Sequence, residues 1–195
     1  MPRWPRGYAV RNINFGEELL DTAFPRHAAS LVRVLAAWRT TWADIGAPGG
    51  ALSRPTRDLA DAFAKAGWVE QAFELEVRLN GVPTVGRSHK VDHFMNKTPD
   101  DPFPGIAVDV EWSNKDEFFD RDLINFEALH SARGIAVGIL ICRSAELHAE
   151  MRRRFGNQRF GSRTTHWEKL MPRLDLGRGG ATPLIAIGIG LSRVT

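Results

Sequence analysis

The sequence predicts an α/β fold, a mixed central β-sheet flanked by helices. The uninterrupted apolar run Ile135–Cys142 is typical of a strand buried on both faces. A segment with helical spacing begins at Asp116 and lies directly before this run, so helix and strand belong to a strand–helix–strand unit. Phe73–Leu79 alternates apolar and charged residues and ends at Asn80-Gly81, a pair typical of a tight antiparallel hairpin. Parallel and antiparallel pairing together require a mixed sheet.

Length and composition fit one domain. The chain has 195 residues, 43% of them apolar, which is enough for a substantial core. We expect a single domain over 1–195, with N-terminal helices in 15–67, a sheet core in 69–142 and a basic C-terminal part in 143–195. The single cysteine, Cys142, excludes an internal disulfide and a thiolate zinc site and fits a reducing compartment. No apolar run approaches the ~18 residues that a membrane span needs, so we expect a cytoplasmic protein.

The N-terminal third is predicted to be mostly helical. Residues 1–15 are basic and turn-rich and carry no apolar signal core. Phe15–Phe24 is amphipathic and should stop at Pro25. A stronger helix should cover His27–Trp42. Thr56 is the expected N-cap of a further helix, which Gly67 ends.

The C-terminal part alternates helical and irregular segments before a last strand. We expect an arginine-rich helix, a polar loop, a short helix, a glycine turn and an apolar strand, at Glu146–Phe155, Gly156–Thr164, Thr165–Leu174, Gly177–Gly180 and Pro183–Leu191. Between Arg143 and Arg178 nine Lys or Arg residues face four acids, a net charge of +5, whereas the whole chain carries only +3. Such a basic segment suits a phosphate backbone, although a solvated basic surface is the ordinary alternative.

An acidic pair lies on the strand predicted over Ile106–Trp112. Asp109 and Glu111 share one face because side chains alternate along a strand, and their Cα atoms lie about 6–7 Å apart. Asp92, in the short strand predicted over Lys90–Phe94, reaches the same face if the two strands are neighbours. Three convergent carboxylates suit Mg²⁺. The alternative is that Asp109 and Glu111 are solvated residues on an outer face.

These acids and their neighbours carry a family resemblance. The order Asp92, then Asp109-Val110-Glu111, resembles the PD-(D/E)XK nuclease pattern. More specific likenesses to the BglII/BstYI group of type II restriction endonucleases lie at Val110–Asp116, Phe119–Leu123, Arg173-Leu174, Gly177–Gly180 and Pro183–Ile189. The resemblance runs from about Lys90 to Gly190. It implies a restriction-endonuclease-like fold and a homodimeric, Mg²⁺-dependent nuclease of the bacterial cytosol.

The resemblance also implies the chemistry and its residues. Asp92, Asp109 and Glu111 would be the catalytic residues and the metal ligands, at a short palindromic site in double-stranded DNA cut to 5′-phosphate ends. The broad pattern has Lys where this chain has Glu111. A Glu there can bind a metal or accept the proton of the attacking water.

DNA contacts are expected just after the strands. By resemblance, Ser113 and Asn114, with Lys115 next, enter the major groove; Asn suits adenine and Lys suits guanine. An ordinary turn cap is the alternative for Ser113 and Asn114. Three further candidates for base or phosphate contact follow later strands and turns: Arg143, Ser144 and Arg178. The alternative for Arg178 is a surface turn.

Two other functions are compatible with the same residues. A structure-selective repair nuclease would use the same acids but respond to nicks, flaps or mismatches. A sequence-specific DNA-binding protein that has lost catalysis is the third possibility, because Glu111 departs from the broad pattern.

Overall fold

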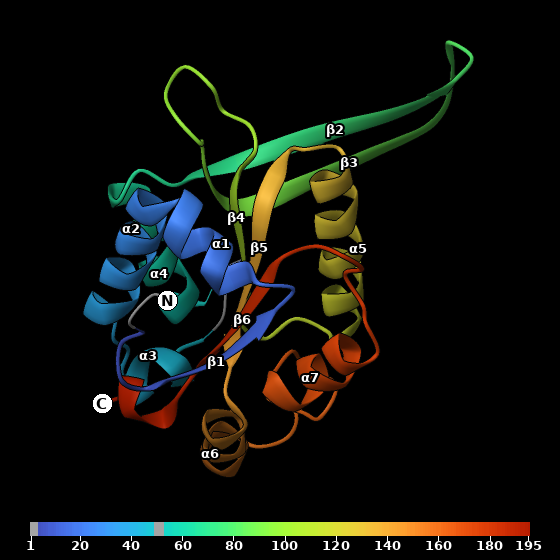
Figure 1. Ribbon diagram of the computed structural model, residues 1–195. Coiled ribbons are helices and arrows are strands. Elements are labelled where there is room, and N and C mark those ends of the chain that lie inside the picture. The colour runs from blue at the N-terminus through green and yellow to red at the C-terminus, as the bar shows by residue number, and fades with distance from the viewer. Residues whose placement is uncertain (1–3, 49–52) are drawn as a thin grey trace.

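The structure, a computed structural model, describes residues 4–48 and 53–195. It confirms the predicted α/β fold: a six-stranded mixed sheet has helices on both faces (Figure 1). The strands are β1 Tyr8–Ile13, β2 Val69–Leu79, β3 Val82–Met95, β4 Gly105–Glu111, β5 Ile135–Arg143 and β6 Leu184–Ile189. The helices are α1 Gly16–Ala23, α2 Pro25–Ala37, α3 Trp42–Gly46, α4 Arg54–Lys65, α5 Glu117–Ser131, α6 Ala145–Phe155, α7 Trp167–Asp175 and the 3₁₀ turn η1 Leu191–Arg193. Among the helices of these two described stretches, none is long and apolar enough to cross a membrane.

The sheet order is β1-β6-β5-β4-β3-β2. Strands β4, β5 and β6 are parallel, and β1 and the β2–β3 hairpin flank them in antiparallel pairing. The unit β4–α5–β5 is the predicted strand–helix–strand unit, and every residue of β5 is buried as its apolar run predicts. Because β4, β5 and β6 are parallel, their carboxyl ends lie at the same end of the sheet.

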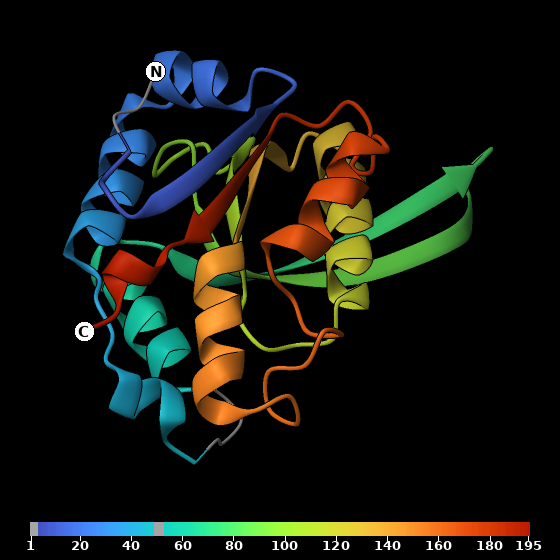
Figure 2. The same ribbon diagram turned by 90° about the horizontal axis from the view of Figure 1, so that it is seen from below.

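Each face of the sheet has its own apolar core. In Figure 2, helices α1, α2 and α4 lie on one side of the sheet, and α5 and α7 on the other. On the first side Leu31 and Phe63 pack with Val108 of β4. On the second side Phe126 of α5 packs against Leu140 of β5, and Asp109 and Glu111 project to this side as well. The face that carries the two acids is therefore covered by α5 rather than open to water.

The β2–β3 hairpin extends beyond the body of the molecule (Figure 1). Its turn is the predicted Asn80-Gly81 pair, with φ of 52° and 85°. Positive φ at both positions is the geometry that matches the twist of paired strands. The returning strand β3 runs unbroken to Met95, so the short strand predicted over Lys90–Phe94 is the base of one long arm.

Two N-terminal predictions were wrong. Residues 8–13, within the segment predicted to be turn-rich, form β1, whose strand conformation depends on pairing with β6 at the other end of the chain. The helix predicted over His27–Trp42 ends at Ala37. Carbonyls of Leu35 and Ala36 accept hydrogen bonds from the buried Arg193 guanidinium, at 2.5 and 3.0 Å, which satisfies the exposed end of the helix.

The predicted cap of α4 was also wrong. The N-cap is Ser53, whose hydroxyl accepts a hydrogen bond from the Thr56 backbone N–H at 3.4 Å. Both residues are good caps. With Ser53 as the cap, Pro55 lies in the first turn, where its missing N–H removes no intrahelical hydrogen bond.

Candidate active site and metal centre

The candidate site lies where the base of β3, the carboxyl end of β4 and the first turns of α5 meet. Asp109 and Glu111 are only 3% exposed each. They are therefore not solvated residues of an outer face, which was the alternative to a metal site. Buried carboxylates need a proton, a basic partner or a cation.

Asp92 and Asp109 are joined across the two neighbouring strands. The backbone N–H of Asp92 donates to Asp109 Oδ1 at 2.9 Å. In return, Asp92 Oδ2 accepts from the backbone N–H of Val110, also at 2.9 Å. Side chains replace ladder hydrogen bonds here, close to a register shift between β2 and β3. The strands neighbour each other as predicted, so Asp92 lies against Asp109.

Glu111 is held from the α5 side. Its Oε2 accepts a hydrogen bond from the Asn114 side chain at 2.8 Å, and its Oε1 lies 3.5 Å from the Arg121 guanidinium. Arg121 also donates to Oδ1 of Asp122, at 2.8 Å. Arg121 is thus the cation that links Glu111 to a further buried acid, Asp122.

Burial first, and repulsion between neighbouring carboxylates second, raise the pKa values of these acids. Burial, helped by the Asp109 carboxylate, raises the pKa of Asp92 to about 6. Burial also raises the pKa of Glu111, as does the nearby Asp122. Burial and Asp109 raise the pKa of Asp122, and Arg121 opposes this. A divalent cation would neutralise such a cluster, and its charge would restore the ionised forms.

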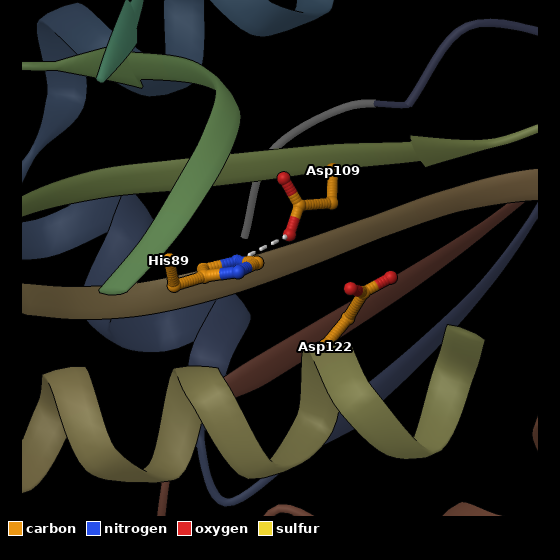
Figure 3. Close-up of side chains that lie close together, drawn as sticks. All are labelled: His89, Asp109 and Asp122. Carbon is orange, nitrogen blue, oxygen red and sulfur yellow. Dashed lines mark hydrogen bonds and ion pairs between the residues drawn. The ribbon is translucent and has the colours of Figure 1, made fainter. Parts of the chain in front are cut away.

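A histidine from the β2–β3 arm completes the group. His89 Nε2 lies 3.4 Å from Asp109 Oδ2, and Asp122 faces both side chains from α5 (Figure 3). One potential ligand atom from each of His89, Asp109 and Asp122 lies within 4.8 Å of the other two. Asp92 and Glu111, the other predicted metal ligands, are not part of this group. Carboxylate oxygens together with an imidazole nitrogen are a donor set that fits a divalent metal ion.

Neither His89 nor Asp122 was predicted as a site residue. Asp122 lies inside the family-like segment Phe119–Leu123, and that position was the signal available. His89 has no motif around it. Its approach depends on how far β3 extends, which the sequence pattern did not reveal.

The family model described as restriction endonuclease BglII/BglIII matches residues 8–189. The chain belongs to this restriction endonuclease family. The match covers nearly the whole chain and confirms the resemblance seen from the residues alone. The comparison with curated proteins found no match.

Family membership supports a type II restriction endonuclease, a hydrolase that acts on DNA. Restriction endonucleases typically use a divalent metal ion, and the buried acids and His89 provide ligands for one.

The residues after β4 lie beside the acids of this endonuclease. Ser113, Asn114 and Lys115 are exposed. Ser113 and Asn114 line a cavity of about 830 Å³, together with Asp92 and Glu111. Residues of α4 also line this cavity. Residues expected to read bases thus lie at the mouth of the acidic site.

The other expected DNA contacts differ in exposure. Arg143 is fully buried and donates to the Thr164 hydroxyl at 2.8 Å and to the Thr165 carbonyl at 2.6 Å. Ser144 is 8% exposed and caps α6 by accepting from the Leu147 N–H. In this conformation both side chains form hydrogen bonds within the protein. Arg178 is exposed in the turn after α7.

Much of the basic segment is paired within the protein. Arg153 and Arg154 both bind Glu150 of the same helix. Arg173 binds Asp120 at 2.9 Å, and Arg159 donates to backbone carbonyls of the α3 end. The +5 charge of residues 143–178 already counts Glu150, but Arg173 pairs with Asp120 from outside the segment and Arg143 is buried. The surface therefore offers DNA less positive charge than +5.

Proposed function

We propose that this endonuclease is a homodimer that hydrolyses one phosphodiester bond in each strand of a short palindromic DNA site, with Mg²⁺. The observation that supports it best is the pair of hydrogen bonds joining Asp92 to Asp109 and Val110, which holds two carboxylates together near the carboxyl end of β4. Glu111, two residues further along the strand, lines the same cavity as Asp92.

In this proposal Asp92 and Asp109 hold the metal ion. When bound, the ion polarises the phosphate and lowers the pKa of a water molecule. Glu111 binds the same ion or accepts the proton of that water. With the ion bound, Glu111 is ionised and can accept a proton. In the DNA-free protein the Asn114 amide donates to Glu111 and holds its orientation.

The reaction follows from this arrangement. The water oxygen attacks phosphorus in line with the bond to the 3′ oxygen, and that bond breaks. The products are a 5′-phosphate and a 3′-hydroxyl. The proton lost by the attacking water goes to Glu111, and the departing 3′ oxygen takes a proton from a solvent water.

Sequence would be read by the exposed residues after β4. Asn114 has the donor and acceptor pattern for adenine, and Lys115 suits guanine. In the free protein the Asn114 amide donates to Glu111, so a contact between Asn114 and a base would exchange that hydrogen bond. We also propose that Arg178 contacts a phosphate. Buried Arg143 and capping Ser144 are left out of this set.

A homodimer fits a palindromic site. Two subunits related by a two-fold axis present identical sites to the two strands of a DNA sequence with the same symmetry. Sedimentation of the protein with a duplex that carries one site should give two chains per duplex.

The central test is cleavage of plasmid DNA with and without Mg²⁺. We expect discrete fragments, no cutting with EDTA, and ends that a ligase joins without added phosphate. Asp92→Ala should lose cutting, whereas Asp100→Ala, which changes an exposed acid of the following loop, should keep it. A smear, or cutting that survives Asp92→Ala, would refute the proposal. So would cleavage directed by nicks or flaps, or specific binding that leaves the DNA intact.

A further inference from the structure

We propose that His89, Asp109 and Asp122 form a second metal site, for a divalent ion that accepts nitrogen, such as Mn²⁺ or Co²⁺. This second site deepens the proposed nuclease function. It rests on that proposal only because Asp109 is also one of the two proposed Mg²⁺ ligands, with Asp92. The new site lies on the α5 side of Asp109.

The geometry is close to that of a metal centre before any ion is added. The three side chains come from β3, β4 and α5 and point toward one another (Figure 3). Two ligand atoms on the same ion are about 3–3.5 Å apart, given metal–ligand bonds of about 2.0–2.2 Å. His89 Nε2 and Asp109 Oδ2 are already 3.4 Å apart, and the whole set falls within 4.8 Å. Small side-chain rotations would close the remaining gap.

Asp122 gives an independent reason to expect a cation. The residue is 0% exposed, and its Oδ1 is bonded to Arg121. Its Oδ2 is buried and accepts no hydrogen bond from an N–H or hydroxyl group of the residues that the structure describes. The Glu111 carboxyl is within hydrogen-bonding reach of Asp122, but only its protonated form can donate, so ionised Glu111 leaves Asp122 Oδ2 unsatisfied. A buried acceptor left unsatisfied costs about 1–3 kcal/mol, and more if it is charged. A cation between Asp122 and Asp109 would remove this cost.

Asn125 is placed to orient the imidazole. Its side-chain amide lies 2.8 Å from His89 Nδ1. A half-turn of an Asn amide exchanges its oxygen and nitrogen. With the oxygen toward Nδ1, that nitrogen keeps its proton, and Nε2 is left with a lone pair directed at the carboxylates. Outer hydrogen bonds of this kind commonly fix the orientation of metal-binding histidines.

The imidazole selects the class of ion. Mg²⁺ prefers oxygen ligands and gives up its waters reluctantly. Mn²⁺, Co²⁺ and Zn²⁺ accept imidazole more readily. In the metal-free protein the half-exposed Arg121 supplies the positive charge to Asp122 and Glu111. We therefore expect an ion bound here to weaken the contacts of Arg121.

The test is direct binding of Co²⁺ to the full chain, followed by calorimetry and by the visible absorption of the ion. His89→Gln and Asp122→Asn should each lower the affinity of one Co²⁺ at least tenfold and change its absorption bands. Asn125→Ala should weaken Co²⁺ binding by about tenfold, since Asn125 is a positioning residue. Asn125→Asp should restore much of the lost affinity. His130→Gln is the matched control, because His130 lies on α5 and its Nδ1 bonds to the carbonyl of Ile135, away from the proposed site.

The outcomes separate this inference from the proposed function. Asp92→Asn removes a proposed Mg²⁺ ligand but should keep the Co²⁺ bound by His89. If His89→Gln binds Co²⁺ as the wild type does, the second site does not exist, even if the wild type cuts DNA with Mg²⁺. If Co²⁺ depends on His89 but no DNA is cut with any ion, the second site stands and the nuclease proposal fails. Melting curves of each variant exclude misfolding as the cause of lost binding.

Discussion

Replacing Asp92 by asparagine should stabilise the metal-free protein while it abolishes cleavage. The amide oxygen of the new side chain can still accept the hydrogen bond from the Val110 N–H, so the change mainly removes a negative charge beside Asp109. The magnitude follows from the pKa of Asp92, which burial and Asp109 raise from 3.8 to about 6.

The sign follows from proton linkage. The folded protein holds the Asp92 proton more tightly than the unfolded chain, so stability falls as pH rises from about 4 through about 6. The raised pKa of Asp92 therefore lowers the free energy of unfolding by about 3 kcal/mol at pH 8, but by only about 0.5 kcal/mol at pH 4. For a domain of this size, about 3 kcal/mol corresponds to roughly 6–12 °C in Tm.

The assay is thermal unfolding with EDTA at pH 8 and at pH 4, for wild type, Asp92→Asn and Asp100→Asn. We expect the Asp92→Asn variant to melt several degrees above wild type at pH 8, and the gain to shrink at pH 4. Saturating Mg²⁺ should raise the Tm of wild type but not of Asp92→Asn, because a bound ion stabilises only the form that binds it. If Asp92→Asn melts at or below the wild-type temperature at pH 8, the inference that ionised Asp92 destabilises the metal-free protein is refuted.

Three further predictions concern other parts of the molecule. Glu111→Gln should stabilise the metal-free protein above pH 5, because burial and Asp122 raise the pKa of Glu111 and its ionised form destabilises the folded protein. The same variant should lose cleavage. Melting curves and plasmid cutting at pH 8 test the two results. Arg143→Met should lower the free energy of unfolding by about 1–3 kcal/mol in urea titrations, since it leaves the buried Thr165 carbonyl without its donor. DNA affinity at a temperature where the variant is folded should be unchanged. Gly138→Ala should lower the free energy of unfolding by about 1–3 kcal/mol, because the new Cβ would lie 2.5 Å from Phe126 Cδ2 between β5 and α5. Gly81→Ala is the comparison: no atom lies within 4 Å of its Cβ, so it should lose about 1 kcal/mol through backbone strain alone.

Local pattern was enough to predict the centre of the fold. The apolar run of β5 specifies a strand buried on both faces, and Asn80-Gly81 specifies a hairpin, because burial pattern and turn chemistry are properties of adjacent residues. The common face of Asp109 and Glu111 follows from alternation in the same way. The family was also readable from the residues around Asp109, and the match over 8–189 confirms it.

Long-range pairing decided what local pattern could not. Strand β1 exists because it pairs with β6, and α2 ends where it does because Arg193 binds its last carbonyls. Each of these contacts joins segments more than 150 residues apart, so no window of sequence contains both partners.

The same distinction applies to the site. Sequence by itself determined which acids are near one another along β4, and it named Asp92 as their partner. Only the tertiary structure brought His89 and Asp122 to Asp109, because their approach depends on the reach of the hairpin arm and on how α5 packs over the sheet. It also decided that the Arg143 guanidinium lies in the interior, since side-chain burial is set by the elements packed around it and not by charge alone.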